Sequence, residues 1–222
     1  MPTSTVEDYL KCILLEEQRE PGTLVTMGQV ATALRVAPGT VTAMVKALAD
    51  GGLLAYEPYS GVRLTDYGRQ LAGHVLRRHR LVEQFLVKVM GMDWTEVHSE
   101  AELLEHAVSE RLIERMDEML GHPAVDPHGD PIPDARGVVA APLLPTLLTC
   151  ELGSPLRVAR IGDQSPDFLR LVDRRGLRPG SRLRVAGRDE AADAVELAIE
   201  ASAEPLTLGF RAASKIQVEP AG

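Results

Sequence analysis

The sequence predicts a mainly α-helical chain that ends in a small β-barrel, an α+β fold built from three domains. Apolar residues recur at steps of three and four through most of the first 120 positions, which is the period of an amphipathic helix. From about position 154 the pattern changes to short runs in which apolar and polar residues alternate, as in half-buried strands. A stretch rich in Pro and Gly, residues 121–149, separates the two patterns and is interpreted as a linker.

Composition narrows the function classes. The chain has 222 residues, which is enough for two or three small domains. It contains no run of eighteen apolar residues, and its first thirty residues do not form a secretory signal, so we expect no membrane partner. Cys12 and Cys150 stand far apart, which argues against a disulfide framework and predicts a cytoplasmic location.

Charge is unevenly distributed along the chain. The net charge of −8 divides into +1 for residues 1–92 and −9 for residues 93–222. The acidity therefore belongs to the C-terminal part. The N-terminal part remains compatible with a basic face that binds nucleic acid.

The first 73 residues predict a winged helix-turn-helix. An amphipathic helix starts at about Val6, Thr26 is the expected N-cap of a second helix, and Pro38 opens a third that Gly51 stops. The segment LLAYEPYSGVRLT then predicts a hairpin that turns at Ser60–Gly61.

Such a unit binds double-stranded DNA by placing the second helix of its helix-turn-helix in the major groove and its hairpin against the DNA backbone. Small and hydroxyl side chains at the start of that helix allow close approach to bases and phosphates, while Val41, Met44, Val45 and Leu48 are expected to face inward. The alternative is an ordinary helical pair with a solvated face. The candidate DNA-binding residues are Thr26, Pro38, Gly39, Thr40, Thr42, Lys46, Tyr59 and Arg63.

The middle of the chain predicts two further amphipathic segments, one long helix over 65–91 and a helix or closely spaced pair over 94–121. Two apolar helices beyond a small DNA-binding unit are expected to bury their stripe in a homodimer. We therefore expect a DNA-binding domain at 1–73, a helical dimerisation and metal-binding domain at 74–140, a linker at 141–149 and a small barrel at 150–222.

Histidines and carboxylates recur at helical intervals in this middle region. His98, Glu102, Glu105 and His106 share one helical face, and His79 and Glu83 are neighbours on the preceding helix. Carboxylates crowded on one face repel unless protons or a cation neutralise them. The pattern suggests two clusters that could hold a metal, one of Asp8, Glu102, Glu105 and His106 and another of His79, Glu83 and His98, and spacing alone does not decide between metal sites and a polar surface. A solvated polar face is the alternative, and His128 is expected to be structural or solvated.

A metal-dependent enzyme is a second function class, and the sequence supports it less well than it supports a binding protein. Glu102-x2-Glu105-His106 matches half of a di-metal carboxylate site, but no second Glu-x-x-His follows, and no HExxH, Gly-x-Ser-x-Gly or phosphate-binding glycine loop occurs. A di-metal hydrolase stays an unfavoured alternative. The expectation is a protein that is not an enzyme.

These segments together resemble the diphtheria toxin repressor and manganese transport regulator family of metal-activated transcription factors. The matching segments are VEDYLKCI, VAPGTVTAMVKAL, YEPYSGVRLTDYGR, RRHRLVEQFL, EHAVSE and PHGDPIP. The resemblance covers nearly the whole chain. It implies a C-terminal FeoA-like barrel, a primary metal site at Asp8, Glu102, Glu105 and His106, and an ancillary site at His79, Glu83 and His98. Barrel ligands at Gln164 and Asp167 are implied as well, with Asp163 as a nearby substitute.

The resemblance also bears on the metal. Iron-responsive members place Met and Cys where this chain has Asp8 and Glu102, and hard carboxylate donors suit Mn²⁺ better. Manganese regulators carry a Glu at the position of Lys11, which as a cation is not a ligand, so a binuclear site is not expected. The implied function is a manganese-activated regulator that represses manganese uptake genes as a dimer on a palindromic operator. A regulator that answers Fe²⁺ is the alternative.

Overall fold

The computed structural model describes residues 3–139, 142–202 and 204–221. Its contacts divide the chain into two units. Unit 1 contains residues 1–82, 102–116 and 132–141, and unit 2 contains residues 83–101, 117–131 and 142–222. Each unit is therefore assembled from segments that are far apart in the sequence.

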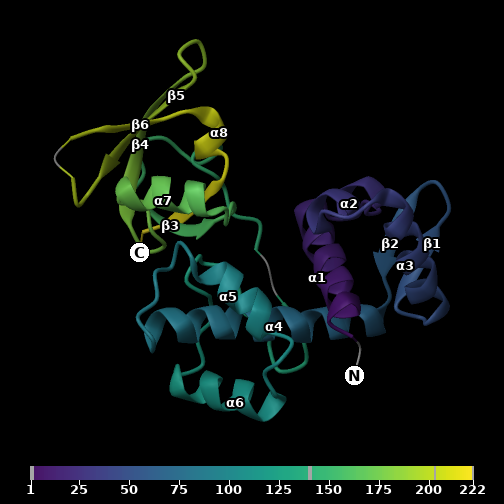
Figure 1. The fold of residues 1–222 in the computed structure, drawn as a ribbon. Coiled ribbons are helices and arrows are strands. Elements are labelled where there is room, and N and C mark those ends of the chain that lie inside the picture. Colours follow the sequence, from purple (N-terminus) through teal and green to yellow (C-terminus); the bar gives the residue numbers. More distant parts are fainter. Residues whose placement is uncertain (1–2, 140–141, 203, 222) are drawn as a thin grey trace. The chain divides into compact units, whose positions relative to one another are not determined.

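Unit 1 begins with the predicted winged helix-turn-helix (Figure 1). Its elements are α1 (Ser4–Arg19), α2 (Met27–Leu34), α3 (Pro38–Asp50), β1 (Leu54–Glu57) and β2 (Gly61–Leu64). Thr26 closes a capping box with Gln29 at the start of α2, and Arg35 ends that helix in the left-handed conformation. The two strands pair antiparallel, with Glu57 opposite Gly61.

The core of this part is mainly aliphatic, in a chain of which only 4% of the residues are aromatic. The predicted inward residues of α3 are confirmed, since Val41, Val45 and Leu48 are buried and Met44 packs partly against the same cluster. They meet Leu10 and Ile13 of α1, both fully buried. This packing leaves the opposite face of α3 in solvent.

The middle of the chain forms α4 (Asp66–Lys88), α5 (Val97–Leu104) and α6 (Glu110–Met119). The prediction that His98, Glu102, Glu105 and His106 share one helical face is wrong for the last two residues. Glu105 and His106 lie in the turn after α5 and not within a helix. Two interactions explain the break. Arg78 Nε donates to the carbonyl oxygen of Glu105 at 2.9 Å, and Ser109 provides capping acceptors for α6 at Leu112 N.

The Pro- and Gly-rich stretch contains buried and closely packed residues, so its interpretation as a linker is corrected for residues 121–139. In unit 2, Asp126, His128 and Asp130 are buried, and the Asp126 carboxylate accepts from the backbone N–H groups of the other two. In unit 1, Gly137 lies against Gly73 of α4 so closely that a Cβ on Gly73 would stand 1.8 Å from the Gly137 oxygen. The part of this stretch in unit 2, residues 121–131, and the part in unit 1, residues 132–139, are therefore both packed.

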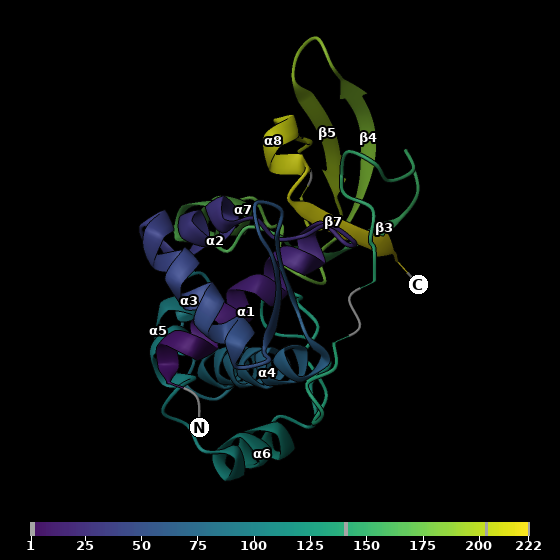
Figure 2. The ribbon, with the colours of Figure 1, turned by 90° about the vertical axis from the view of Figure 1, so that its right-hand side faces the viewer.

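Unit 2 carries a five-stranded antiparallel sheet in the order β6-β5-β4-β3-β7 (Figure 2). The elements are β3 (Leu156–Ile161), α7 (Pro166–Arg174), β4 (Arg182–Asp189), β5 (Ala194–Ile199), β6 (Leu206–Leu208), α8 (Phe210–Ala213) and β7 (Ile216–Pro220). Register shifts in β3 and β4 mark irregularities that curve a sheet. The mainly helical fold with a C-terminal sheet domain is confirmed.

Among the described residues, none of the helices has the length and apolar composition that crossing a bilayer requires.

Candidate metal centre and nucleic-acid interface

Unit 1 brings Asp8, Glu105 and His106 together, and we call these three residues with Glu102 the primary cluster. Asp8 lies on α1, whereas Glu105 and His106 follow α5. His106 Nε2 stands 2.9 Å from Asp8 Oδ1 and 3.3 Å from Glu105 Oε1. One nitrogen and two carboxylates, with ligand atoms within 4.8 Å of one another, have the spacing of a metal site.

Lys11 places a cation in the same cluster, a contact that the sequence did not predict. Its Nζ lies 2.7 Å from Glu102 Oε1 and 2.6 Å from Glu105 Oε1, and its side chain is only 8% exposed. Burial lowers the pKa of Lys11, but Glu105 and Glu102 outweigh it and hold that pKa above the ordinary value. Lys11 follows Asp8 by three positions on one helical face, but nothing local in the sequence pairs it with carboxylates 91 and 94 positions away.

His79 contacts the primary cluster from α4. Its Nδ1 is 2.5 Å from Glu105 Oε2 and 4.0 Å from Glu102 Oε1, so these three residues form a second group with metal-ligand spacing. Burial raises the pKa of Glu105, but His79 and Lys11 outweigh it and lower that pKa below its usual value. Glu105 is therefore an anion although it is completely buried.

The histidine of the primary cluster is drawn toward its cationic form. Burial lowers the pKa of His106, but hydrogen bonding to Glu7 and the charges of Glu105 and Asp8 raise it above its ordinary value. Burial raises the pKa of Asp8 against the opposing effect of His106. A divalent ion at the Nε2 side would replace the proton that these carboxylates attract.

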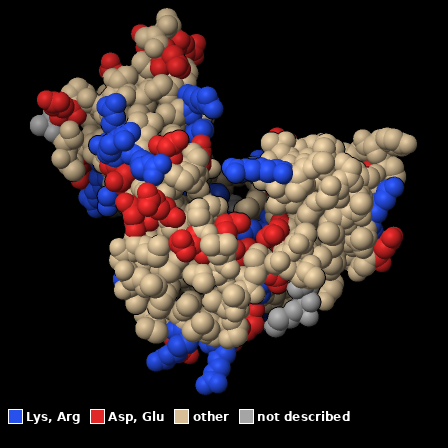
Figure 3. Space-filling view, in the orientation of Figure 1, with Lys and Arg blue, Asp and Glu red and all other residues tan. Residues whose placement is uncertain are grey.

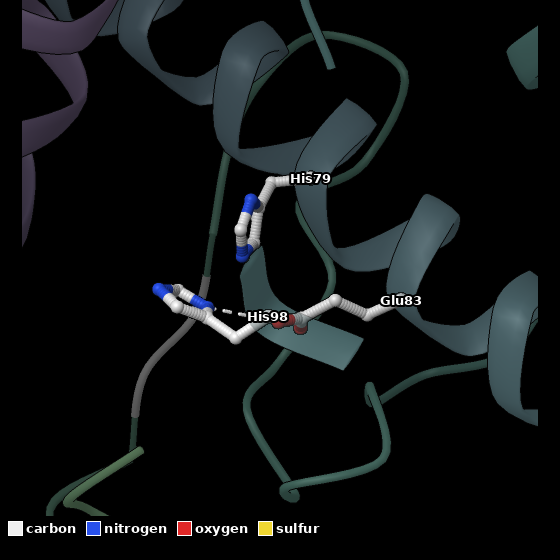
Figure 4. Close-up of side chains that lie close together, drawn as sticks. All are labelled: His79, Glu83 and His98. Atoms are coloured by element: carbon white, nitrogen blue, oxygen red, sulfur yellow. Dashed lines mark hydrogen bonds and ion pairs between the residues drawn. The ribbon is translucent and has the colours of Figure 1, made fainter. Parts of the chain in front are cut away.

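Unit 2 holds a second set of candidate ligands around Glu83 of α4. His98 Nδ1 lies 3.0 Å from Glu83 Oε1, as Figure 4 shows. His79 stands one turn before Glu83 on the same helix (Figure 4). Two of the three residues predicted as the ancillary site are thus in direct contact within unit 2.

The same Glu83 faces His128 and Asp126, both of which are buried and were not among the predicted ligands. His128 Nδ1 lies 3.6 Å from Glu83 Oε2 and 4.0 Å from Asp126 Oδ1, and the three residues have metal-ligand spacing. His128 Nε2 donates to the Trp94 carbonyl at 2.9 Å, so Nδ1 faces the carboxylates. Burial lowers the pKa of His128, but Glu83 outweighs it and raises that pKa to about 9.

The barrel residues implied as ligands are placed differently from one another. Gln164 Nε2 donates to Asp130 Oδ2 at 2.7 Å, beside the Asp126–His128 turn. The Asp167 side chain is 98% exposed and pairs with Arg170, and Asp163 pairs with Lys215. Burial raises the pKa of Asp163, but its bond to Lys215 outweighs this and the pKa is lowered. Within the described ranges, none of these three belongs to a group with metal-ligand spacing.

The candidate nucleic-acid interface lies on α3 and the β1–β2 hairpin. Pro38, Gly39, Thr40 and Lys46 are exposed, whereas Thr42 is half-buried and its hydroxyl donates to the Pro38 carbonyl. Tyr59 is completely exposed at the tip of the hairpin. Two of the candidate DNA-binding residues already have partners within the chain. Thr26 forms the capping box of α2 with Gln29, and Arg63 pairs with Glu57 at 3.2 Å.

Charge does not mark this surface strongly. Over α2, α3 and the hairpin, the face drawn in Figure 3 is mostly uncharged, with few Lys or Arg side chains. A basic face, with which the charge distribution along the sequence is compatible, is therefore not evident in that view. Small and hydroxyl side chains at the N-terminus of α3 are the principal feature that suits close approach to phosphate.

Fold and clusters together define a class, that of winged helix-turn-helix proteins with carboxylate–histidine groups spaced to bind a divalent ion. The comparisons with known families agree with this description. Residues 1–62 match the iron dependent repressor N-terminal DNA binding domain, residues 65–134 match the metal binding and dimerisation domain of the same repressors, and residues 146–220 match the FeoA domain.

Individual relatives extend over most of the chain. The iron-dependent repressor IdeR of Mycobacterium leprae (strain TN) is 33% identical over 193 residues, which are 82% of this chain and 83% of the relative. The HTH-type transcriptional regulator MntR of Shouchella clausii (strain KSM-K16) is 36% identical over 122 residues, 54% of this chain and 82% of the relative. A solved manganese-dependent transcriptional repressor in complex with manganese is 42% identical, with a TM-score of 0.88 and coverage of 97% of this chain and 100% of that one.

The chain belongs to the iron-dependent repressor family, the family of the diphtheria toxin repressor and the manganese transport regulators, whose members are metal-dependent transcriptional repressors. The resemblance stated from the sequence is confirmed. Membership supplies a DNA-binding domain and a dimerisation domain, and it places the chain among transcriptional regulators.

Proposed function

We propose that this chain is a Mn²⁺-activated repressor that binds a palindromic DNA operator as a homodimer in the cytoplasm, with manganese uptake genes as its targets. The observation that carries the proposal is the primary cluster, in which Asp8, Glu105 and His106 converge from α1 and the turn after α5. The donor set fits a divalent cation. It is made of hard carboxylate oxygens and one imidazole.

The choice of Mn²⁺ rests on donor chemistry. Among the described residues, the groups with metal-ligand spacing are made of histidines and carboxylates and contain no cysteine. Burial raises the pKa of Cys12 to about 12, so its thiol stays protonated and is a poor ligand. The similar solved structure is named as manganese-dependent, which agrees. An Fe²⁺ regulator is the second candidate, because the similar IdeR is named as iron-dependent.

We further propose an ancillary metal position around Glu83. His98 and Glu83 are in contact, and His79 on the preceding turn completes the set that the family resemblance implies. Asp126 and His128 offer the other Glu83 oxygen a carboxylate and a nitrogen. We include these two as candidate ligands, and we keep Gln164 and Asp167 as predicted barrel ligands.

A homodimer is supported by apolar side chains that unit 1 leaves in solvent. Leu103 and Leu104 of α5 and Leu112 of α6 are exposed. Large apolar residues gathered on neighbouring helices mark an association surface more often than an ordinary one. The match to a dimerisation domain over the same residues points to a second copy of the chain as the partner.

The chain's own residues suggest how metal and DNA binding are coupled. Asp8 belongs to α1, which packs against the helix-turn-helix, whereas Glu105 and His106 belong to the segment between the dimerisation helices. A bound cation supplies the positive charge that joins these ligands. Asp8, Glu105 and His106, held together by such an ion, would fix α1, and through it α3, relative to the dimerisation helices, and activation would depend on how much tighter the DNA-competent state binds the ion.

Titration of operator affinity with each metal under anaerobic conditions tests the proposal. Mn²⁺ is expected to tighten DNA binding at least roughly tenfold, within the usual range of allosteric coupling. Glu105→Ala should abolish this response, while Glu100→Ala, an exposed carboxylate of α5, should not. A response to Fe²⁺ alone would establish the second candidate. DNA affinity that ignores every metal would refute both.

A further inference from the structure

Glu7 hydrogen-bonds the candidate ligand His106 on the nitrogen that faces away from the other ligands. Glu7 Oε2 lies 2.6 Å from His106 Nδ1, whereas Nε2 faces Asp8 and Glu105. An ionised carboxylate only accepts hydrogen bonds, so Nδ1 must be the donor. Nε2, which stands 2.9 Å from Asp8 Oδ1, is then the nitrogen that can give its lone pair to an ion replacing its proton in the primary cluster.

Arg78 of α4 in turn holds Glu7. Its Nη2 donates to Glu7 Oε1 at 2.7 Å, so the two Glu7 oxygens are divided between Arg78 and His106. The same guanidinium donates to the Glu105 carbonyl at 2.9 Å and to Glu110 Oε1 at 3.0 Å. The Arg78 and Glu7 side chains are only 11% and 13% exposed. Because the planar Arg78 guanidinium is held by three acceptors at once, it has one orientation and holds the Glu7 carboxylate in one rotamer.

We propose that Glu7 and Arg78 are positioning residues for metal binding, because they fix the tautomer and ring orientation of His106 so that Nε2 presents its lone pair to the metal position. The inference rests on the proposed function. A histidine ligand whose second nitrogen donates to a carboxylate is more basic and better oriented, and loss of such a carboxylate costs about 10- to 100-fold in metal affinity.

A purely structural role for Glu7 makes a different prediction. If the Glu7–Arg78 pair only joined α1 to α4, its removal would weaken metal binding equally whether or not His106 were present. If Glu7 acts through His106, its removal matters only while the imidazole is there. The two roles are therefore separated by a double-mutant cycle between positions 7 and 106.

The test measures Mn²⁺ affinity by calorimetry on the full chain. Glu7→Ala should weaken binding about 10- to 100-fold, and Glu7→Gln, whose amide oxygen can accept the same bond, should recover most of the loss. Glu114→Ala is the control, because it removes an exposed carboxylate of α6 that lies outside the Arg78–Glu7–His106 chain of contacts. It should leave affinity unchanged. In a His106→Ala background, Glu7→Ala should cause no additional loss.

A second measurement does not need the metal. Nitrogen-15 NMR of the imidazoles, at a pH where His106 is neutral, should show the Nδ1–H tautomer in the unaltered chain and a mixture in Glu7→Ala. Equal tautomers in the two proteins, or an additive loss of affinity with His106→Ala, would overturn the inference. If the unaltered chain bound no Mn²⁺, the proposed function would fail, and the NMR comparison would still decide whether Glu7 orients His106.

Discussion

Lys11 places a positive charge between two carboxylates of the primary cluster, and we expect this single residue to limit how many cations the cluster binds. Its ammonium forms ion pairs with Glu102 and Glu105. These two carboxylates and His79 have the spacing of metal ligands. The lysine therefore supplies the charge that a second ion would otherwise bring. A mononuclear primary site, as the sequence implied, is consistent with this contact.

Replacing Lys11 by Met should lower the stability of the metal-free chain and raise its capacity for Mn²⁺. Removing one partner from a buried ion pair costs about 3 kcal/mol or more, because a charge is left uncompensated. The freed carboxylates should then bind one more ion per protomer, measured as metal content after dialysis and as thermal unfolding of the metal-free protein. Lys88→Met, at an exposed lysine of α4, is the control. An unchanged metal content would show that Lys11 does not exclude an ion.

We also expect individual residues to determine which metal is bound. Asp8→Met combined with Glu102→Cys should shift the response from Mn²⁺ toward Fe²⁺, because thioether and thiolate are softer donors than carboxylate. Glu105 and His106 are retained. The measurement is DNA affinity against free Mn²⁺ and free Fe²⁺ without oxygen, with the unaltered chain beside the variant. The same Mn²⁺-to-Fe²⁺ ratio in both proteins would place selectivity outside these two positions.

At the scale of elements, α4 is held against the segment 132–139 by the near contact of two glycines. A Cβ on Gly73 would stand 1.8 Å from the Gly137 backbone oxygen, too close for any side chain. Arg77 of the same helix donates to the Pro133 carbonyl at 2.7 Å. The Pro- and Gly-rich segment is therefore a packed part of unit 1.

Gly73→Ala should destabilise unit 1 by about 1–3 kcal/mol or more, as expected for overpacking against backbone. Gly39→Ala is the matched change in α3, where a Cβ meets nothing within 4 Å. It should be neutral or stabilising by up to about 1 kcal/mol, since Ala favours a helix over Gly. Urea unfolding of the metal-free proteins measures both. Equal stabilities would mean that the segment 132–139 moves aside at little cost.

For the whole molecule, the exposed apolar residues of α5 and α6 require a partner surface, and the dimerisation domain of the family suggests a second copy of the chain. Leu112→Glu should therefore convert a dimer into a monomer, because an isologous interface repeats the buried charge on both subunits. Light scattering coupled to size exclusion measures the mass. Leu143→Glu, at a fully exposed leucine outside these helices, should leave the mass unchanged. A Leu112→Glu variant that remained dimeric would place the interface elsewhere.

The sequence alone determined the fold class, the order of the winged helix-turn-helix and the family, because these depend on local signals. Thr26 caps α2 and Pro38 opens α3 through interactions with near neighbours, and the period of Val41, Val45 and Leu48 shows which face is buried. The same periodicity brought Asp8, Glu105 and His106 forward as candidates for one cluster. Their individual roles as ligands remain predictions.

Only the tertiary structure decided which side chains complete those clusters. Lys11 contacts carboxylates 91 and 94 positions away. His128 lies near Glu83, although composition alone predicted that the segment containing His128 is a linker. Glu7 of α1 likewise contacts Arg78 and His106, which lie 71 and 99 positions away in the chain. Long-range pairing leaves no periodic trace in a single sequence, because the distance between two residues in space is set by the packing of whole elements and not by their spacing along the chain.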